Sequence, residues 1–397
     1  MDKKTIRDID VTGKRIIVRA DFNIPLDKET GAITDDTRIR AVLPTIRYLI
    51  DNHAKLILCS HLGRPKGKVV EKLRLAPIAK QLSQHLGQQV ITAQDCIGPE
   101  VEDAVENLKE GEVLLLENLR FHPEEEQNDP AFAQSLARLA NIFVNDAFGT
   151  THRAHASVVG IPKYLPAVAG FLIEKELDTM GKALDNSTHP TALLIGGAKV
   201  SDKIGLLENI LEKVDSLLIG GGMACTFLKA QGYEVGESLL EEDKVGFAKE
   251  LMESAKQRGV HLLLPVDVII AKDHKRPLTF KTVPAGEVLP NWYIGDIGPR
   301  TTELFSDELK KCKTVIWNGT MGMSETILFA KGTRTIAQVL ANLDITSIVG
   351  GGSTAEVVEE MGLAEKMTHV STGGGASIRF LEGRTLPGVA ALQDKEG

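Results

Sequence analysis

One alternation of sequence patterns runs through the whole chain and limits its fold more than any other feature. Short apolar segments rich in β-branched residues recur, and stretches with the helical spacing of apolar residues separate them. The segments are RIIVRAD, KLILCSH, QVITAQD, EVLLLEN and NIFVNDAF in the first half, and TALLIGG, SLLIGGG, HLLLPVDVII, TVIWNGT, TSIVGGG and THVSTGG in the second. Strands that alternate with helices form parallel sheets covered by helices on both faces. The sequence therefore predicts an α/β fold with doubly wound, Rossmann-like parallel sheets.

The length of the chain agrees with a division into two such domains. A chain of 397 residues exceeds what one hydrophobic core usually organises. Residues 168–180, with EKELDTM after AGFL, predict a helix between the domains. We therefore expect an N-terminal domain over residues 1–170 and a C-terminal domain over residues 171–386, which includes this interdomain helix and a hinge.

Composition excludes several classes of partner. A formal charge of −8 makes nucleic acid and anionic membranes poor partners, because both attract basic surfaces. Cys59, Cys96, Cys225 and Cys312 form no CxxC pair, which favours reduced thiols over a disulfide frame. The first residues, MDKKTIRDID, contain no apolar stretch, and no window approaches about 18 consecutive apolar residues. We expect a cytoplasmic protein that binds no membrane.

The residues that follow the predicted strands of the first half are polar and basic. In parallel sheets, ligands bind beyond the carboxyl ends of the strands, so these positions indicate the ligand. They include Asp21, Asn23, His61, Arg64, Arg120, His152, Arg153 and His155, and Arg38 begins the next predicted helix after Asp21. Arginine forks match carboxylate and phosphate oxygens in pairs. Each arginine alone is typical of an ordinary surface, but together they predict a site for a small ligand that carries both groups.

Glycine-rich turns follow the predicted strands of the second half. They contain Gly196 and Gly197, Gly220 to Gly222, Gly319, Gly350 to Gly352, and Gly373 to Gly375. Such turns allow the backbone to approach a nucleotide closely, with helix N-termini facing its phosphates. One of them, GGAKVSDK, places Lys199 and Lys203 where a helix is expected to begin, which suits an anion; an ordinary turn with two solvated lysines is the alternative. A polyanion site in one half and a nucleotide site in the other predict phosphoryl transfer.

Several segments together resemble the phosphoglycerate kinase family. They are VRADFNIPL, SHLGRPKG, LLENLRFHPEEE, NDAFGTTHRAHAS, GGAKVSDKI, VIWNGTMG, STGGGAS and FLEGRTLPGV, in the order of that family and across nearly the whole chain. The resemblance implies a monomeric glycolytic enzyme that moves a phosphoryl group between 1,3-bisphosphoglycerate and ADP, giving 3-phosphoglycerate and ATP. It also implies domain closure about a hinge and a C-terminal tail, residues 387–397, that packs on the N-terminal domain.

The resemblance also implies roles for individual residues of this sequence. Arg38, Lys203, Gly374 and Gly375, with Gly373 beside them, match positions that stabilise the migrating phosphoryl group. The matched triose-binding residues are Asp21, Asn23, Arg38, His61, Arg64, Arg120 and Arg153. The matched nucleotide-binding residues are Lys199, Lys203, Gly221, Gly222, Asn318, Glu325, Gly351, Gly352, Ser353 and Thr354, with Glu325 at the ribose and Asn318 beside the phosphates.

The sequence departs from the family at the position that usually holds magnesium. Ser353 stands where the family usually has an aspartate, Thr320 replaces a usual proline, and Ser324 replaces a usual phenylalanine. Mg²⁺ takes much of its ligation from phosphates and water, and a hydroxyl serves as its protein ligand in some enzymes. We therefore expect Mg²⁺ to accompany ATP or ADP here, held by the phosphates, by water and by Ser353 or Thr354.

Three other functions remain open at this stage. A dinucleotide-dependent oxidoreductase would need a GxGxxG turn before a helix and an acid about 20 residues later, which the sequence lacks. A non-catalytic sensor of triose phosphate or nucleotide would not need both Arg38 and Lys203, and a scaffold would not need basic strand ends. Outside the matched site residues, we expect Glu124 to Glu126 to lie in a solvated loop. We expect Trp292 and Trp317 to pack in the protein interior. Met321 and Met323 are candidates for the adenine side of the nucleotide site.

Overall fold

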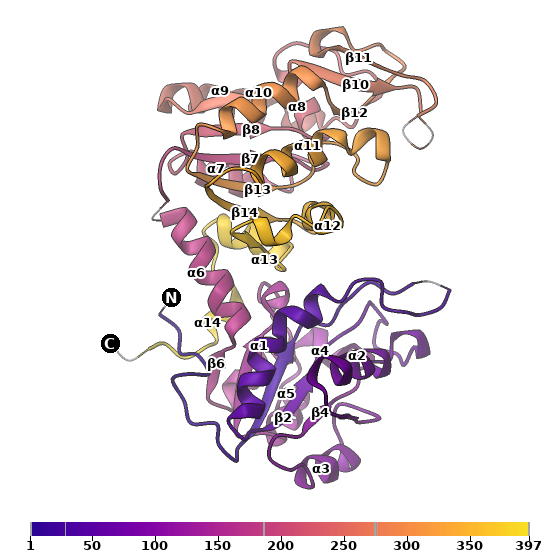
Figure 1. Cartoon of the computed structure of the whole chain (residues 1–397), viewed down its shortest axis with the longest axis vertical. Coiled ribbons are helices and arrows are strands. Elements are labelled where there is room, and N and C mark those ends of the chain that lie inside the picture. The colour runs from indigo at the N-terminus through magenta and orange to yellow at the C-terminus, as the bar shows by residue number, and fades with distance from the viewer. Residues whose placement is uncertain (1, 28, 186, 274, 276, 396–397) are drawn as a thin grey trace. The chain divides into compact units, whose positions relative to one another are not determined.

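The computed structural model of the protein describes residues 2–27, 29–185, 187–273, 275 and 277–395. The chain divides into two compact units, and each is described by itself. Unit 1 comprises residues 1–178 and 385–397, and unit 2 comprises residues 179–384 (Figure 1). No helix among the described residues is both long and apolar enough to cross a membrane.

Unit 1 contains a six-stranded parallel sheet with the order β3-β4-β2-β1-β5-β6. Its strands are β1 (Arg15–Ala20), β2 (Lys55–Cys59), β3 (Val90–Thr92), β4 (Val113–Leu115), β5 (Ile142–Asp146) and β6 (Ala167–Ala169). Its α-helices, apart from α6, are α1 (Thr37–Asp51), α2 (Ala76–Leu86), α3 (Pro99–Glu106), α4 (Pro123–Gln127), α5 (Pro130–Arg138) and α14 (Pro387–Ala390). The five predicted strands of the first half are thus present, and β6 is an addition.

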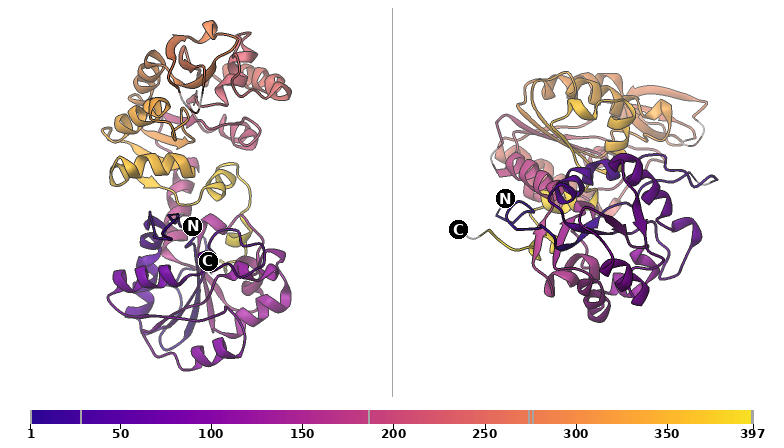
Figure 2. Two further views of the ribbon diagram at one scale, coloured as in Figure 1. Left: turned by 90° about the vertical axis from the view of Figure 1, so that its right-hand side faces the viewer. Right: turned by 60° about the horizontal axis from the view of Figure 1, so that its bottom comes forward.

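Both faces of this sheet are covered, as its apolar strands require. Alternate strand residues such as Ile16 and Val18 pack against α1 and α2, while their neighbour Ile17 is fully buried on the other face. Helices flank the sheet on both sides in Figure 2. A strand that is buried on both faces needs apolar residues at every position, whereas a strand with one exposed face alternates apolar and polar residues. This explains why the strands of unit 1 appear in the sequence as continuous apolar segments.

Unit 2 contains a second six-stranded parallel sheet, ordered β15-β14-β13-β7-β8-β9. Its strands are β7 (Thr191–Ile195), β8 (Ser216–Ile219), β9 (His261–Leu263), β13 (Thr314–Asn318), β14 (Thr346–Gly350) and β15 (His369–Val370). Its helices are α7 (Ile204–Ile210), α8 (Ala224–Ala230), α9 (Val245–Arg258), α10 (Pro299–Leu309), α11 (Lys331–Leu340), α12 (Gly352–Glu360) and α13 (Gly375–Leu381). The fully buried Trp317 lies in its core against α10 and α11, which confirms the packing role expected for this residue.

A small antiparallel sheet in unit 2 was not predicted. It consists of β10 (Asp267–Ala271) between β11 (Phe280–Pro284) and β12 (Tyr293–Ile297). The segment HLLLPVDVII, predicted as one strand, therefore splits at Pro265 into β9 of the large sheet and β10 of the small one. Proline lacks the N–H that a central strand needs, so it ends the pairing there.

Helix α6 (Phe171–Asp185) begins in unit 1 and continues into unit 2. Asp146, fully buried at the end of β5, accepts hydrogen bonds from the backbone N–H groups of Leu172 and Ile173 in its first turn. Burial raises the pKa of this carboxyl to about 7. The chain returns to unit 1 after Arg384, where Gly388 donates to the Thr151 carbonyl at 2.8 Å.

Candidate active site

The basic residues of unit 1 lie at one edge of its sheet. Strands β4, β2, β1 and β5 are neighbours and run parallel, so the segments that leave their carboxyl ends emerge side by side. Asp21 and Asn23 follow β1, His61 and Arg64 follow β2, Arg120 follows β4 in the short 3₁₀ helix Leu119–Phe121, and Arg153 follows β5. The fold therefore brings together the strand ends that the sequence marked as a polyanion site.

Arg38, in the first turn of α1, is anchored to residues that follow β1. Its Nη1 donates to Asp21 Oδ2 at 3.1 Å and to the Asn23 carbonyl at 3.0 Å. The Asn23 side chain in turn accepts from the Gly63 N–H at 2.8 Å, which links this turn to the one after β2. About a third of the Arg38 side chain stays exposed, so the guanidinium is oriented by protein groups and still reachable by a ligand.

Arg120 is buried close to other cations. Its Nη1 donates to the Gly63 carbonyl at 2.9 Å, and Glu126 lies 3.2 Å from its Nε. Burial, followed by the nearby charge of Arg153, lowers the pKa of Arg120 to about 10. Arg153 is half-buried and Arg64 is exposed. Like charges crowded in this way favour an anion as their common partner.

A buried network behind these cations was missed by the sequence analysis. Arg19, inside β1, is almost fully buried and donates through Nε to Ser157 Oγ at 2.9 Å and through Nη2 to His61 Nδ1 at 3.0 Å. Ser157 donates through its hydroxyl to Glu125 Oε1 at 2.5 Å and through its N–H to Glu125 Oε2 at 2.9 Å. The signal was present in RIIVRAD, where an arginine interrupts an apolar strand.

The prediction of a solvated loop at Glu124 to Glu126 is wrong at Glu125. This stretch forms α4, and Glu125 is fully buried. Its burial raises the pKa of its carboxyl, while Arg19 and the Ser157 hydrogen bonds oppose that rise. The sequence alone does not reveal that Glu125 faces Arg19, because the two residues are more than 100 positions apart.

The same network determines the tautomer of His61. Burial and then Arg19 hold the pKa of His61 well below its usual value, so the imidazole is neutral. Arginine can only donate, and its partner Nδ1 must therefore be the accepting nitrogen of the ring. The proton of neutral His61 consequently lies on Nε2, which makes that atom a hydrogen-bond donor.

The glycine-rich turns of unit 2 also lie at one sheet edge, because β15, β14, β13, β7 and β8 are adjacent and parallel. Some of these glycines pack the turns against one another. Gly319 has φ +99°, and a Cβ there would lie 2.3 Å from the Gly196 carbonyl oxygen; a Cβ on Gly221 would lie 2.6 Å from Gly197 N. Gly352 and Gly374 differ, because no other atom lies within 4 Å of a Cβ at either position. These two leave room for a ligand.

Lys203 is a buried cation at the end of the GGAKVSDK turn. Its Nζ donates to Asn318 Oδ1, and burial lowers its pKa to about 8, an effect that Asp202 and Glu382 partly offset. The Asn318 Nδ2 group is buried without a hydrogen-bond partner. A buried amide of this kind with an unused donor is a group that a bound phosphate would satisfy.

A helix begins at the end of this turn, as the sequence predicted. Helix α7 begins at Ile204, so Lys199 and Lys203 both precede it, and Lys199 is exposed while Lys203 is buried. The Glu241 carboxylate accepts the backbone N–H groups of Val200 at 2.6 Å and Ser201 at 3.1 Å. A protein carboxylate rather than a ligand therefore satisfies those donors in the turn.

A cavity of about 570 Å³ opens beside these turns within unit 2. Of the residues matched to nucleotide binding, Gly221, Gly222, Glu325 and Ser353 line it. Met321 and Met323, the candidates for the adenine side, also line it, together with apolar residues such as Leu228 and Val268. The lining does not include Lys199, Lys203, Asn318, Gly351, Gly352 or Thr354. The cavity has the mixed lining that a nucleotide base and sugar require.

The residues around this cavity fit a magnesium ion only if phosphates supply most of its ligands. Ser353 is exposed at the start of α12, whereas Thr354 is fully buried and its hydroxyl accepts from the Gly319 N–H at 3.0 Å. Asp296 lines the cavity, but its two oxygens accept from the N–H groups of Ile297 and Gly332. Among the described residues, the one group of three or more Asp, Glu, His or Cys ligands lies in unit 1.

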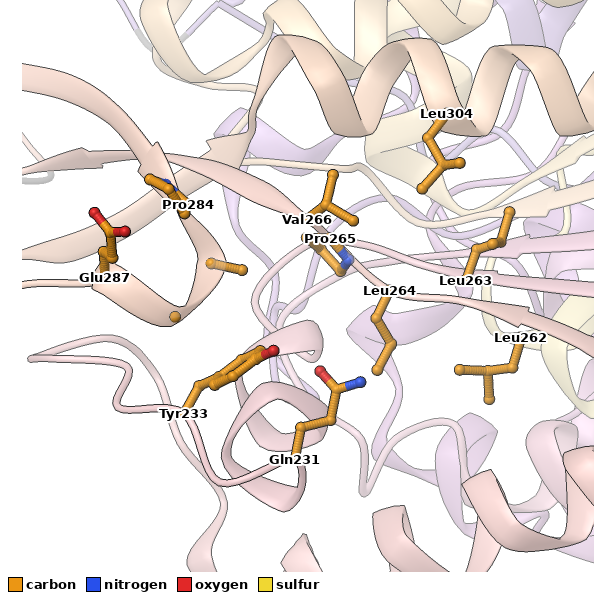
Figure 3. A pocket seen from close by; sticks show the side chains of 12 residues that line it. Gln231, Tyr233, Leu262, Leu263, Leu264, Pro265, Val266, Pro284, Glu287 and Leu304 are labelled. Atoms are coloured by element: carbon orange, nitrogen blue, oxygen red, sulfur yellow. The ribbon is translucent and has the colours of Figure 1, made fainter.

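A second cavity in unit 2, of about 600 Å³, has a different character (Figure 3). Leu262, Leu263, Leu264 and Val266 line it from one side, and Tyr233 faces them. It contains none of the predicted site residues, and Glu287 is the charged member of its lining. The nucleotide expectation therefore rests on the first cavity.

Comparison with known proteins gives consistent matches along the full chain. The family model described as phosphoglycerate kinase matches residues 6–384. The chain is 56% identical over 395 residues to a phosphoglycerate kinase of Moorella thermoacetica and 53% identical to one of Pelotomaculum thermopropionicum, each match covering 100% of both chains. Among solved structures, it is similar to the phosphoglycerate kinases of Coxiella burnetii (TM-score 0.85, 39% identity) and Pyrococcus horikoshii OT3 (TM-score 0.83, 33% identity), with 98% of each chain covered.

Proposed function

The chain belongs to the phosphoglycerate kinase family and is a phosphotransferase of glycolysis, and we propose that unit 1 binds the phosphoglycerate while unit 2 binds the nucleotide. The observation that carries the assignment of unit 1 is the gathering of cations at four adjacent strand ends. For unit 2 it is the cavity beside the glycine-rich turns. The reaction interconverts 1,3-bisphosphoglycerate and ADP with 3-phosphoglycerate and ATP.

In the proposed triose site, the protein supplies donors that match a carboxylate and a phosphate. Nη1 of Arg38 and Nη1 of Arg120 donate to protein groups, and Glu126 lies beside Arg120 Nε, which leaves Nη2 of both arginines to a ligand. His61 donates from Nε2, because Arg19 occupies Nδ1. Arg64 and Arg153 add charge, and Asp21 and Asn23 position Arg38 and the turn at Gly63.

The transfer step needs positive charge more than it needs proton transfer. The accepting carboxylate of 3-phosphoglycerate is ionised at neutral pH, so no general base is required. Arg38 and Lys203 would stabilise the charge on the oxygens of the migrating group, and the N–H groups of Gly374 and Gly375 would add to it. Because these residues belong to different units, we propose that the units close about the hinge for transfer and exclude water.

In the proposed nucleotide site, the base and the phosphates contact different residues. The part of the cavity lined by Met321 and Met323 takes the adenine, and Glu325 binds the ribose hydroxyls. Lys199, Lys203 and the unsatisfied Asn318 amide lie on the phosphate side. The remaining residues of the proposed nucleotide site are Gly221, Gly222, Gly351 and Gly352 in the turns, with Ser353 and Thr354 in the first turn of α12.

Mg²⁺ bound with the nucleotide would neutralise phosphate charge, and Ser353 is our candidate for its protein ligand because it lines the cavity. Thr354 is less suitable, since its hydroxyl already accepts the Gly319 N–H. We expect a Ser353→Asp variant to bind Mg²⁺ more tightly at fixed nucleotide. If only that variant turned over, magnesium binding in the wild type would be too weak for catalysis, and the chain would act as a sensor. We further propose that the protein works as a monomer in the cytoplasm.

One coupled assay tests the assignment of the two sites. The protein is incubated with 3-phosphoglycerate, MgATP, NADH and a dehydrogenase that consumes 1,3-bisphosphoglycerate. We expect NADH oxidation only when the protein, 3-phosphoglycerate and MgATP are all present. The rate of this oxidation should be lower with the Arg38→Ala and Lys203→Met variants. Undiminished activity in both variants would refute the proposed catalytic residues while leaving the family assignment in place.

A further inference from the structure

Asp95, Cys96 and His122 of unit 1 form a cluster that the kinase reaction does not use. Asp95 and Cys96 lie in the loop after β3, and His122 lies between the 3₁₀ helix Leu119–Phe121 and α4. Strands β3 and β4 are paired in parallel, so the segments that leave their carboxyl ends meet. One carboxylate oxygen, one thiol sulfur and one imidazole nitrogen all lie within 4.8 Å of one another.

The Asp95 carboxylate is the centre of the cluster. Its Oδ1 lies 2.6 Å from His122 Nε2, and it accepts the Cys96 backbone N–H at 2.6 Å. The Cys96 sulfur lies within 4.8 Å of an Asp95 carboxylate oxygen and of a His122 ring nitrogen. Each of the three residues thus presents one potential ligand atom to the same small volume. A divalent cation there would replace the protons that now lie between these atoms.

The three ligand types are selective among metals. Thiolate and imidazole favour Zn²⁺ and related borderline-soft ions, whereas Mg²⁺ and Ca²⁺ take oxygen ligands. Asp95 and a Cys96 thiolate together carry the charge that compensates a divalent ion. The Cys96 side chain is fully buried, but the Asp95 side chain is 52% exposed and that of His122 is 27% exposed, which gives an ion a path from solvent.

We propose that Asp95, Cys96 and His122 bind a Zn²⁺-type divalent cation, with water at the fourth position, at a site separate from the magnesium that accompanies the nucleotide. Binding deprotonates Cys96, whose proton leaves to solvent, and moves the imidazole proton of His122 from Nε2 to Nδ1, so that Nε2 ligates the metal. The bound ion joins the loop after β3 to the start of α4. His122 lies two residues after Arg120, so the metal would also fix the segment that carries this triose-site arginine.

The test uses Co²⁺ as the spectroscopic probe and the full-length protein without nucleotide. We expect about one Co²⁺ per chain, with intense near-ultraviolet absorption from thiolate-to-Co²⁺ charge transfer, displacement by Zn²⁺ but not by Mg²⁺, and release of about one proton per metal. Cys96→Ala should abolish the absorption, and His122→Gln should weaken Co²⁺ binding at least tenfold. Cys225→Ala is the matched control, since Cys225 is also buried but lies in unit 2.

Three results would overturn the proposal. The first is an absence of thiolate absorption in the wild type up to millimolar Co²⁺. The second is the same absorption in Cys96→Ala. The third is unchanged Co²⁺ affinity in His122→Gln, which changes a partly exposed side chain and keeps the test valid if Cys96→Ala does not fold.

Discussion

Replacement of Lys203 by methionine should stabilise the unliganded protein while it removes most of the activity. The Lys203 ammonium is nearly fully buried, and the group bonded to it is the neutral Asn318 amide. Burying a cation without a full counter-charge costs free energy in the folded state. Methionine has a similar length and no charge, so the variant removes that cost and keeps most of the packing.

The expected magnitude follows from the pKa of Lys203. The difference between the usual value of 10.5 and about 8 corresponds to about 3 kcal/mol of destabilisation at neutral pH. Loss of the donor to Asn318 in the variant offsets about 1–2 kcal/mol of this gain. We therefore expect unit 2 of Lys203→Met to gain about 1–2 kcal/mol in free energy of unfolding at pH 7.

The pH dependence gives the sharper test. Because the folded pKa of Lys203 lies below the unfolded one, its destabilisation is complete below pH 8 and disappears as the pH rises from about 8 to 10.5. Buried thiols such as Cys59, with a pKa raised to about 12, oppose this trend, so the difference between wild type and variant is the quantity to follow. Urea unfolding of both proteins at pH 7 and pH 10 measures it. A stability difference that does not shrink at pH 10 would refute the reasoning.

Three further predictions concern single residues. Arg38→Ala should lower kcat by roughly 10²- to 10³-fold with little change in nucleotide affinity, because its charge acts on the transition state; near-normal kcat in steady-state assays would contradict this. Glu125→Gln should lower the free energy of unfolding of unit 1 by about 1–3 kcal/mol in thermal or urea unfolding, since its carboxylate holds Ser157 and faces Arg19; Glu124→Gln is the matched control, and an equal loss in both would argue against the network. Gly319→Ala should destabilise unit 2 by about 2–4 kcal/mol, because a Cβ there would clash with the Gly196 carbonyl; Gly352→Ala, which meets no atom, should stay within about 1 kcal/mol in the same unfolding measurement.

The alternation of apolar segments and helical stretches was sufficient to predict both parallel sheets. Strands buried on both faces need long apolar runs, and such runs are conspicuous in RIIVRAD or TALLIGG. The small antiparallel sheet was not predictable in the same way. Four of the five residues of this edge strand β11 are exposed, and two of them, Lys281 and Thr282, are polar, so its pattern does not differ from that of a loop.

The residues of the candidate site also differ in how far the sequence alone could identify them. Arg120 was a candidate because it follows a strand, and ligands bind beyond the carboxyl ends of parallel strands, whereas Ser353 was a candidate only through the resemblance to the family. The sequence showed Arg19 only as an arginine that interrupts an apolar strand, and it did not single out Glu125, because only the folded chain brings these two segments together. The distinction between Gly319, which packs against Gly196, and Gly352, which faces open space, also requires coordinates.

The two units hold the cations of their candidate sites differently, and this difference predicts a proton linkage. In unit 1, Arg38 is paired with a carboxylate before any ligand arrives, whereas Lys203 of unit 2 is bonded to an amide. A bound nucleotide phosphate would supply the missing negative charge and raise the pKa of Lys203 from about 8 toward its usual range. At pH 8, where the nucleotide phosphates are already ionised, binding should then take up about half a proton, and affinity should fall as the pH rises further. Calorimetry of MgATP binding at pH 8, in buffers with different ionisation enthalpies and without phosphoglycerate, measures this uptake. Zero uptake in the wild type, or equal uptake in Lys203→Met, would show that Lys203 does not meet the phosphates.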